Sequence, residues 1–486
     1  MDSTILDTDL LAFNGLDGSN GKYLVGTLTE AGLRERAYRL KPTQILGSED
    51  HRASLNHRWQ TGKPDWRLRP DYDPNKLSDA GWGLVFPSRS DPKTITQMLE
   101  ALAVLITHRQ AQAGKRFRIY QGTDGYQPGE SGSQFAIRHG IDAGAVDPNK
   151  IPYYLLIVAA PHEIPFEFQY ELDVQFAVGR IFFNTLEEFD WYAHSIVRAE
   201  QGDPAAKPDR RAVFFGVINE DDLSTARSAE YLVKPLYSYT ANERPAELGW
   251  KAELIEPKDA NKARLLSLLG GADAPAFLFS AGHGLGWPAG HPRQIPYQGA
   301  LVTRDWPGPI AGGTVPTRDM YLAGEDIPDE ANLLGRLAFF FACYGAGTPA
   351  WEDFAVTEGQ ELRSLAERPF LAALPQRLLG HPRGGLLAVI GHVERAWGCS
   401  FKRKDSQAEP ETFKALVYNL LRGNPVGLAL DEMNDRYAQI AAQLTNALSK
   451  LKHNPKFDAH TIASLWLANN DARGYAVIGD PAVRLG

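Results

Sequence analysis

Nearly unbroken apolar runs of strand length recur along the second half of the chain. Residues 277–281 read FLFSA, residues 337–341 read LAFFF, and residues 385–391 read GLLAVIG. Runs without alternating polar positions are typical of strands that are buried on both faces of a parallel sheet. The pattern therefore predicts a sheet with helices covering both of its faces.

Segments with helical spacing alternate with the apolar runs. Asp91 and Pro92 are residue types favoured at a helix N-cap and first turn, and apolar residues follow them at helical spacing. We expect strands over residues 117–121, 153–160, 174–181, 212–218, 277–281, 337–341, 385–392 and 475–481. We expect helices over residues 186–199, from near 224, and over 261–269, 369–379, 413–422 and 426–448. This alternation predicts a three-layer α/β/α fold with a mainly parallel central sheet.

Breaks in the pattern suggest three units. A hydrophilic joint rich in Gly and Pro spans residues 202–208, which places a boundary near residue 205. We expect an irregular N-terminal arm or small domain over residues 1–90, a smaller α/β subdomain over 91–205 and a larger one over 206–486. Residues 287–328 are rich in Gly and Pro and too long for a tight connection, so we expect loops around a functional site there.

Composition excludes several classes of protein. The 486 residues are 43% hydrophobic and 23% charged, with a net charge of −8, which argues against general binding of nucleic acids or anionic membranes. The acidic first residues predict no signal peptide, and no apolar run is long enough to cross a bilayer. Two cysteines give no disulfide framework. We therefore expect a cytoplasmic protein, and the oligomeric state stays open.

Two chemically reactive side chains directly follow two of the expected strands. His283 comes after residues 277–281 and Cys343 after residues 337–341. Ligands of open α/β sheets bind beyond the carboxyl ends of the strands, so a thiol and an imidazole are expected to face one crevice. A buried, inert Cys and a hydrogen-bonded core His are the alternative interpretations, but Gly282 and Gly284 favour function because they let the backbone turn and a substrate approach closely.

Other candidates for this chemistry are weaker. Cys399 follows a strand without standing at its buried end, and the remaining histidines considered, His162, His291 and His381, all lie beside proline or in loops. Two distant cysteines and scattered histidines lack the spacing of metal ligands, and no glycine-rich phosphate loop is present. We therefore expect neither a metal nor another cofactor.

In their order along the chain, several segments resemble cysteine peptidases with the caspase-like fold, above all the gingipain family. The segments are VGRI at 178–181, GHG at 282–284, AC at 342–343, GGLLAVIG at 384–391 and IGDPAVRL at 478–485. The resemblance covers roughly residues 150–486, and residues 1–90 have no counterpart in it. Intracellular peptidases of the CHAT type are a close second, because gingipains are secreted and this chain shows no signal peptide.

The resemblance implies a cysteine endopeptidase with Cys343 as nucleophile, His283 as its base, and an oxyanion hole made by the backbone N–H groups of Gly284 and Cys343. It also implies a pocket for the residue before the scissile bond. Acidic groups in such a pocket favour a substrate Arg or Lys, and a Trp can stack on the stem of that residue, although each of these charges alone is more often a solvated loop residue. The expected pocket residues are Asp221, Asp222, Glu394 and Trp397.

The implied partner is a dedicated protein substrate, such as a pore-forming effector of bacterial defence. Two other functions stay open. One is a catalytically silent scaffold that keeps the fold and binds partners, and the other is a different acyl-transfer reaction on the same Cys and His.

Overall fold

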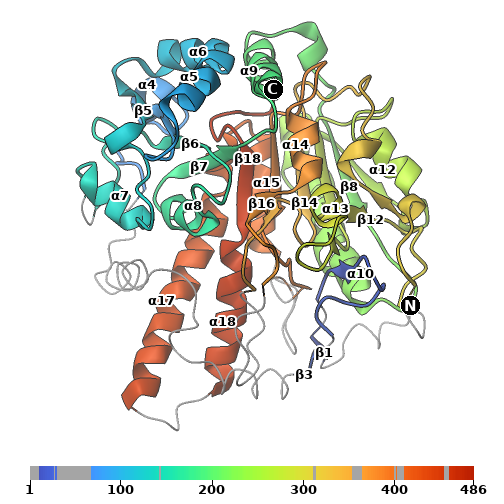
Figure 1. The fold of residues 1–486 in the computed structure, drawn as a ribbon. Helices are drawn as coiled ribbons and strands as arrows, with labels where there is room; N and C mark the ends of the chain where they lie inside the picture. The colour runs from blue at the N-terminus through green and yellow to red at the C-terminus, as the bar shows by residue number, and fades with distance from the viewer. Residues whose placement is uncertain are drawn as a thin grey trace.

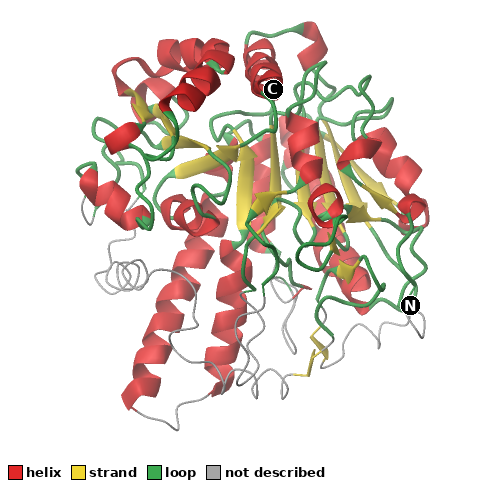
Figure 2. Cartoon of the chain, in the orientation of Figure 1, coloured by secondary structure: helices red, strands yellow, loops and turns green. Residues whose placement is uncertain are grey.

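A computed structural model describes residues 10–11, 13–26, 28–29, 67–141, 144–309, 314–352, 364–398, 401, 410–453 and 459–486. At its centre a ten-stranded sheet lies between layers of helices (Figure 1 and Figure 2). The predicted three-layer α/β/α fold is therefore confirmed. Most of the expected unit 1–90, and Cys399, lie outside the described residues.

The sheet is mainly parallel, as predicted. Its strands, in spatial order, are β5 (Phe117–Tyr120), β4 (Trp82–Val85), β6 (Tyr154–Val158), β7 (Ala177–Ile181), β18 (Tyr475–Gly479), β17 (Ala388–His392), β14 (Leu337–Phe341), β10 (Phe277–Ala281), β8 (Arg211–Gly216) and β9 (Lys251–Ile255). The single antiparallel pairing among them joins β17 to β18, whereas β18 runs parallel to β7.

The helices follow the strands along the chain. The α-helices are α4 (Leu77–Ala80), α5 (Pro92–Ala101), α6 (Ala103–Ala113), α7 (Gly132–Arg138), α8 (Phe166–Asp173), α9 (Leu186–Glu200), α10 (Leu223–Ser228), α11 (Lys234–Asn242), α12 (Lys262–Leu268), α13 (Gln294–Tyr297), α14 (Ala373–Leu379), α15 (Glu411–Leu421), α16 (Val426–Ala429), α17 (Asp431–His453) and α18 (Ala459–Arg473). None of the described helices combines the length and apolar character that a membrane span requires.

In the described part of the chain, four short two-stranded sheets accompany the central one. They pair β1 (Leu10–Leu11) with β3 (Leu28–Thr29), β2 (Leu16–Asp17) with β11 (Leu285–Gly286), β12 (Leu301–Val302) with β13 (Tyr321–Leu322), and β15 (Gly347–Thr348) with β16 (Phe370–Leu371). Through β2, the N-terminal segment (residues 13–24) is therefore attached beside the loop that follows β10.

The expected units over residues 91–205 and 206–486 share the central sheet. Strand β7 of the first pairs with β18 of the second, and β4 belongs to the same sheet although it precedes residue 91. The core strands β10, β14 and β17 are buried along their whole length. The rings of Phe279 and Phe339 stack across β10 and β14 with centroids 4.7 Å apart, so apolar contacts hold these two strands side by side.

A buried ion network ties the two halves of the sheet together. Arg109, on α6, donates from Nε to Asp480 Oδ2 at 2.8 Å and from Nη2 to Glu200 Oε1 at 2.6 Å. Asp480 follows β18 and also accepts from Trp82 Nε1 at 2.9 Å. Burial raises the pKa of Glu200, but the charge of Arg109 and hydrogen bonds from His108, Arg109 and Gln112 outweigh it and lower the pKa to about 2.

We expect Arg109→Met to lower the free energy of unfolding by about 3–5 kcal/mol, because it leaves buried Asp480 without its cation. Since the folded pKa of Glu200 lies below its ordinary value, the stabilisation it provides is present above about pH 4.5 and is lost as the pH falls towards 2. Urea unfolding at pH 7 and pH 3 measures both effects. Lys76→Ala, which breaks the exposed pair with Asp73, is the control and should cost less than about 1 kcal/mol. Equal losses in the two variants would contradict the role of the network.

Candidate active site at the carboxyl ends of β10 and β14

The register of two neighbouring strands brings His283 and Cys343 to one edge of the sheet. Strands β10 and β14 are parallel, with Ala281 opposite Phe341. Beyond them, Gly282 N still donates to Phe341 O at 3.2 Å, which extends the pairing by one step. His283 and Cys343 are the next residues on the two strands, so both side chains start from the same edge.

The backbone at Gly284 approaches that of Cys343 closely. A Cβ added to Gly284 would lie 1.9 Å from Cys343 O and 2.9 Å from Cys343 N, so no larger residue fits there. Within the described part of the chain, the N–H groups of Gly284 and Cys343 donate to no other residue. An oxyanion hole requires two such unengaged N–H donors near the reacting sulfur.

A buried carboxylate holds the His283 imidazole. Asp222 Oδ2 contacts His283 Nε2, and both side chains are fully buried. Asp222 is also the N-cap of α10, since its Oδ1 accepts from Ser224 N at 2.9 Å and from Thr225 N at 3.2 Å. These contacts fix the carboxylate, and the carboxylate in turn orients the ring. His283 Nδ1 accepts from Gly15 N at 2.8 Å, which puts the ring proton on Nε2, between His283 and Asp222.

The thiol of Cys343 is covered by the N-terminal segment. Its Sγ donates to Asn14 O at 2.7 Å, and Cys343 is fully buried. Leu24 packs against Cys343 from the same segment, together with Tyr344 and Leu365. Burial raises the pKa of Cys343 to about 12, against a smaller lowering by Arg395. In this form the sulfur is therefore a thiol rather than a thiolate.

The N-terminal segment also reaches the carboxylate behind the imidazole. Tyr23 hydrogen-bonds Asp222, and its pKa is raised by burial and then by the negative charge of that carboxylate. The Tyr23 and His283 rings lie 5.8 Å apart between centroids. Residues 13–24 thus contact each of the three polar side chains at this edge of the sheet.

The expected pocket residues occupy different environments. Asp221 is exposed on a turn with a φ of 53°, whereas Asp222 contacts His283 instead of lining an open pocket. Glu394 is buried with a φ of 76°, and its carboxylate lies 3.8 Å from Arg395, which also pairs with buried Glu352. Burial raises the pKa of Glu394 well above its ordinary value, although Arg395 lowers it.

Trp397 lies next to the segment that covers the thiol. Its ring meets that of Phe13 edge-on with centroids 4.0 Å apart, and the two residues form an antiparallel β-bridge. Both side chains are packed against residues of α17 and α18, including Leu444 and Trp466. The partner of Trp397, Phe13, thus directly precedes Asn14, whose carbonyl oxygen contacts Cys343.

Sequence reasoning missed the residues that contact the reactive side chains from the N-terminus. Asn14 and Gly15 carry no motif, and an Asn-Gly pair usually indicates a turn. The sequence suggests Asp222 only as a pocket residue. Its position after a buried strand and before Ser224 and Thr225 indicates a helix cap, but not the partnership with His283. Two of the other histidines that the sequence offered lie elsewhere: His381 contacts Pro328 O, and the His291 ring stacks on Trp287.

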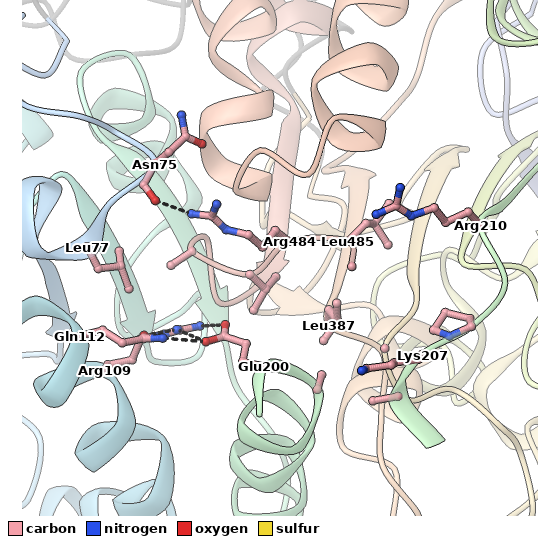
Figure 3. A pocket seen from close by; sticks show the side chains of 17 residues that line it. Asn75, Leu77, Arg109, Gln112, Glu200, Lys207, Arg210, Leu387, Arg484 and Leu485 are labelled. Atoms are coloured by element: carbon pink, nitrogen blue, oxygen red, sulfur yellow. Dashed lines mark hydrogen bonds and ion pairs between the residues drawn. The ribbon is translucent and has the colours of Figure 1, made fainter. Parts of the chain in front are cut away.

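A cavity of about 620 Å³ lies at the opposite edge of the sheet (Figure 3). Residues that precede β8, β14 and β17 line it, including Arg210, Gly335 and Leu387, so it faces the amino ends of those strands. Its lining contains no Cys, His, Ser or Thr. It therefore offers none of the usual nucleophile and base pairs of acyl transfer. Among the described residues, no group of three or more His, Cys, Asp or Glu is arranged to hold a metal ion.

Comparison with known proteins gives distant structural similarities only. No protein-family model and no curated protein matches the chain. A solved structure described as a protease has 12% sequence identity and a TM-score of 0.47, over 84% of this chain and 80% of its own. Two structures of the separase–securin complex of Saccharomyces cerevisiae have 10% and 11% identity and TM-scores of 0.29 and 0.32, over 68% of this chain and 16% of theirs. With scores in this range, the function has to be argued from the site itself.

Proposed function

We propose that this chain is a cysteine peptidase in which Cys343 is the nucleophile and His283 its general base. The observation that carries the proposal is a peptide bond of the chain itself, between Asn14 and Gly15. The oxygen of that bond is 2.7 Å from Cys343 Sγ, and its nitrogen is 2.8 Å from His283 Nδ1. One peptide group of the chain thus lies against both the thiol and the imidazole. The thiol has to move only from the carbonyl oxygen to the adjoining carbonyl carbon in order to add, and the imidazole already lies beside the nitrogen that it must protonate.

Each group at the site then has a role. His283 Nδ1 takes the thiol proton, and the thiolate adds to the carbonyl carbon. The N–H groups of Gly284 and Cys343 stabilise the oxyanion that forms. The imidazolium returns the proton to the departing nitrogen, and water hydrolyses the thioester. Asp222 is a positioning residue, because it keeps the Nε2 proton directed towards itself and stabilises the imidazolium.

The pocket residues support an Arg or Lys substrate less well than the sequence suggested. Asp221 is exposed, Asp222 contacts His283, and Glu394 is buried beside Arg395. A cytoplasmic location and a dedicated protein substrate, such as a pore-forming defence effector, stay predictions from the sequence.

One observation favours the alternative of a catalytically silent scaffold. Cys343 is fully buried under the N-terminal segment, and its pKa of about 12 leaves it un-ionised. The thiol of a peptidase cleaves a supplied peptide, whereas the thiol of a scaffold leaves it intact. Variants of Cys343 and His283 therefore distinguish the two functions.

We expect Cys343→Ala and His283→Ala each to lower cleavage of a mixed peptide library by at least about 1,000-fold, because either change removes the acyl-enzyme step. Mass spectrometry of the products measures this loss. Cys399→Ala removes the other cysteine of the chain and is the matched control, with activity retained. A cooperative urea unfolding transition in each variant would show that the variants are folded. Equal product formation by wild type and Cys343→Ala would overturn the proposal.

Asp222→Asn should lower kcat by about 100- to 10,000-fold and leave KM within about twofold, because the ring loses its orientation and the imidazolium its counter-charge. Asn retains the helix cap, so the effect is not one of folding. The ionisation that controls kcat should also move to lower pH, as the imidazolium is less stabilised. Asp221→Asn, at the neighbouring exposed position, should behave as wild type. If the pH profile of kcat shifted equally in Asp222→Asn and Asp221→Asn, a positioning role for Asp222 would be ruled out.

A further inference from the structure

Residues 13–17 pass through the candidate active site in the manner of a bound peptide. On one side, Phe13 forms an antiparallel bridge with Trp397. On the other, β2 pairs with β11, and Leu16 N donates to Gly284 O at 3.1 Å. Addition of a strand to exposed backbone is a common way for proteins to bind extended peptides. The peptide group that lies between these two attachments is the one that contacts Cys343 and His283.

The side chain of Asn14 fills a closed polar pocket. Asn14 is fully buried, and its Oδ1 accepts from Ser224 Oγ at 2.6 Å. Its Nδ2 faces Gly282 O at 3.4 Å and Ser228 Oγ at 3.5 Å. Ser224 and Ser228 both lie on α10, and Ser228 Oγ donates in turn to Ser224 O at 3.0 Å. The pocket thus presents a hydroxyl donor to one end of the carboxamide and a carbonyl acceptor to the other.

This pattern matches asparagine better than its closest relatives. An Asp carboxylate would place an oxygen against Gly282 O, where two acceptors repel each other. Gln is one methylene longer than the space that Asn14 fills, and a small apolar residue would leave the Ser224 hydroxyl without its partner. An Arg or Lys would bring a charge into a pocket whose three contacting groups are all neutral.

The residue after Asn14 is restricted by shape. Gly15 has a φ of +115°, and a Cβ on it would lie 2.9 Å from Cys343 Sγ and 2.8 Å from Leu24. Only glycine lets the backbone pass this close to the thiol in that conformation. The sequence Phe13-Asn14-Gly15 therefore fits the site at three consecutive positions.

Resting on the proposed peptidase function, we propose that the enzyme cleaves after asparagine and that its own Asn14–Gly15 bond is its first substrate. The Cys343 sulfur bonds to the carbonyl carbon of Asn14, and the C–N bond to Gly15 breaks. The thiol proton passes through His283 to the nitrogen of Gly15. Water then supplies a hydroxyl to the Asn14 carbonyl and a proton that returns to Cys343. The products are residues 1–14 with a new carboxylate and residues 15–486 with a new amine, which is a hydrolysis with no further reactant.

The first test follows the intact mass of the purified full-length chain over time at neutral pH. We expect wild type to accumulate residues 15–486 and Cys343→Ala to remain whole. The Cys343→Ala control also excludes spontaneous breakage of the Asn-Gly bond, which needs no thiol. Asn14→Asp and Asn14→Gln should be processed at least about tenfold more slowly than wild type. Processing that is equally fast in Asn14→Gln, or a wild-type chain that stays whole, would overturn self-cleavage at this bond.

The second test supplies separate peptides that differ only in the residue before the scissile bond, with Phe before it and Gly after it. We expect kcat/KM to be at least about tenfold higher for Asn than for Asp, Gln, Ala or Arg. Ser224→Ala should lower kcat/KM more for the Asn peptide than for the Ala peptide, because only the asparagine carboxamide accepts a hydrogen bond from the Ser224 hydroxyl. Cleavage after Arg with none after Asn would overturn this inference and leave the proposed function standing. If no peptide is cut in a Cys343-dependent way, both the preference for asparagine and the proposed peptidase function fail.

Discussion

The parallel pairing of β10 with β14 is the constraint on which the rest of the site depends. It sets Ala281 opposite Phe341, and the two residues that follow each strand then bring an imidazole and a thiol to the same edge. A slip of one residue in this register would move one of the two side chains to the other face of the sheet. The aromatic stacking of Phe279 on Phe339 and the burial of both strands oppose such a slip. The close approach of Gly284 to Cys343 follows from the same alignment.

The three polar side chains of the site, Asp222, His283 and Cys343, are covered by the N-terminal segment. Asp222 and His283 are held together in the interior, where a carboxylate–imidazole contact is strong because little water competes with it. Cys343 beside them is a thiol with a pKa of about 12, because the N-terminal segment keeps water away from it. The peptide group at Asn14–Gly15 separates the sulfur from the imidazole. Under the proposed function, a small shift of this segment lets His283 take the thiol proton, and cleavage of the segment then opens the site to other peptides.

Much of the fold could be predicted because its core strands are unbroken runs of apolar residues, which are stable only when both faces of the sheet are buried. The strands that carry His283 and Cys343 are examples. The edge strand β9 escaped prediction because its sequence, KAELI, mixes polar with apolar residues and is only partly buried. The helix expected over residues 426–448 is divided into α16 and α17 in the structure. Gly427 packs so tightly on Ala177 and Pro481 that a Cβ there would lie 2.7 Å from Ala177 Cβ.

The contacts that complete the site could not be predicted from the sequence, because they join residues far apart in the chain. Gly15 is 268 positions from His283, and Asn14 is 329 positions from Cys343. Asp222 lies 61 positions before His283, and only the pairing of β8 with β10 brings the loops after these strands together. Local sequence marks Asp222 as a helix cap, and nothing local identifies its second partner.

The most direct measurement of the central claim is the rate at which iodoacetamide alkylates Cys343, followed by peptide mapping between pH 5 and pH 11, in wild type and in Gly15→Val. A Val side chain at position 15 cannot coexist with Cys343 Sγ at the observed distance, so the variant uncovers the thiol. We predict slow alkylation across this range in wild-type chains whose Asn14–Gly15 bond is still intact. In the variant we predict fast alkylation with a midpoint below the ordinary thiol value of about 8.5, because His283 then stabilises the thiolate. Identical rates and midpoints in the two proteins would contradict the account.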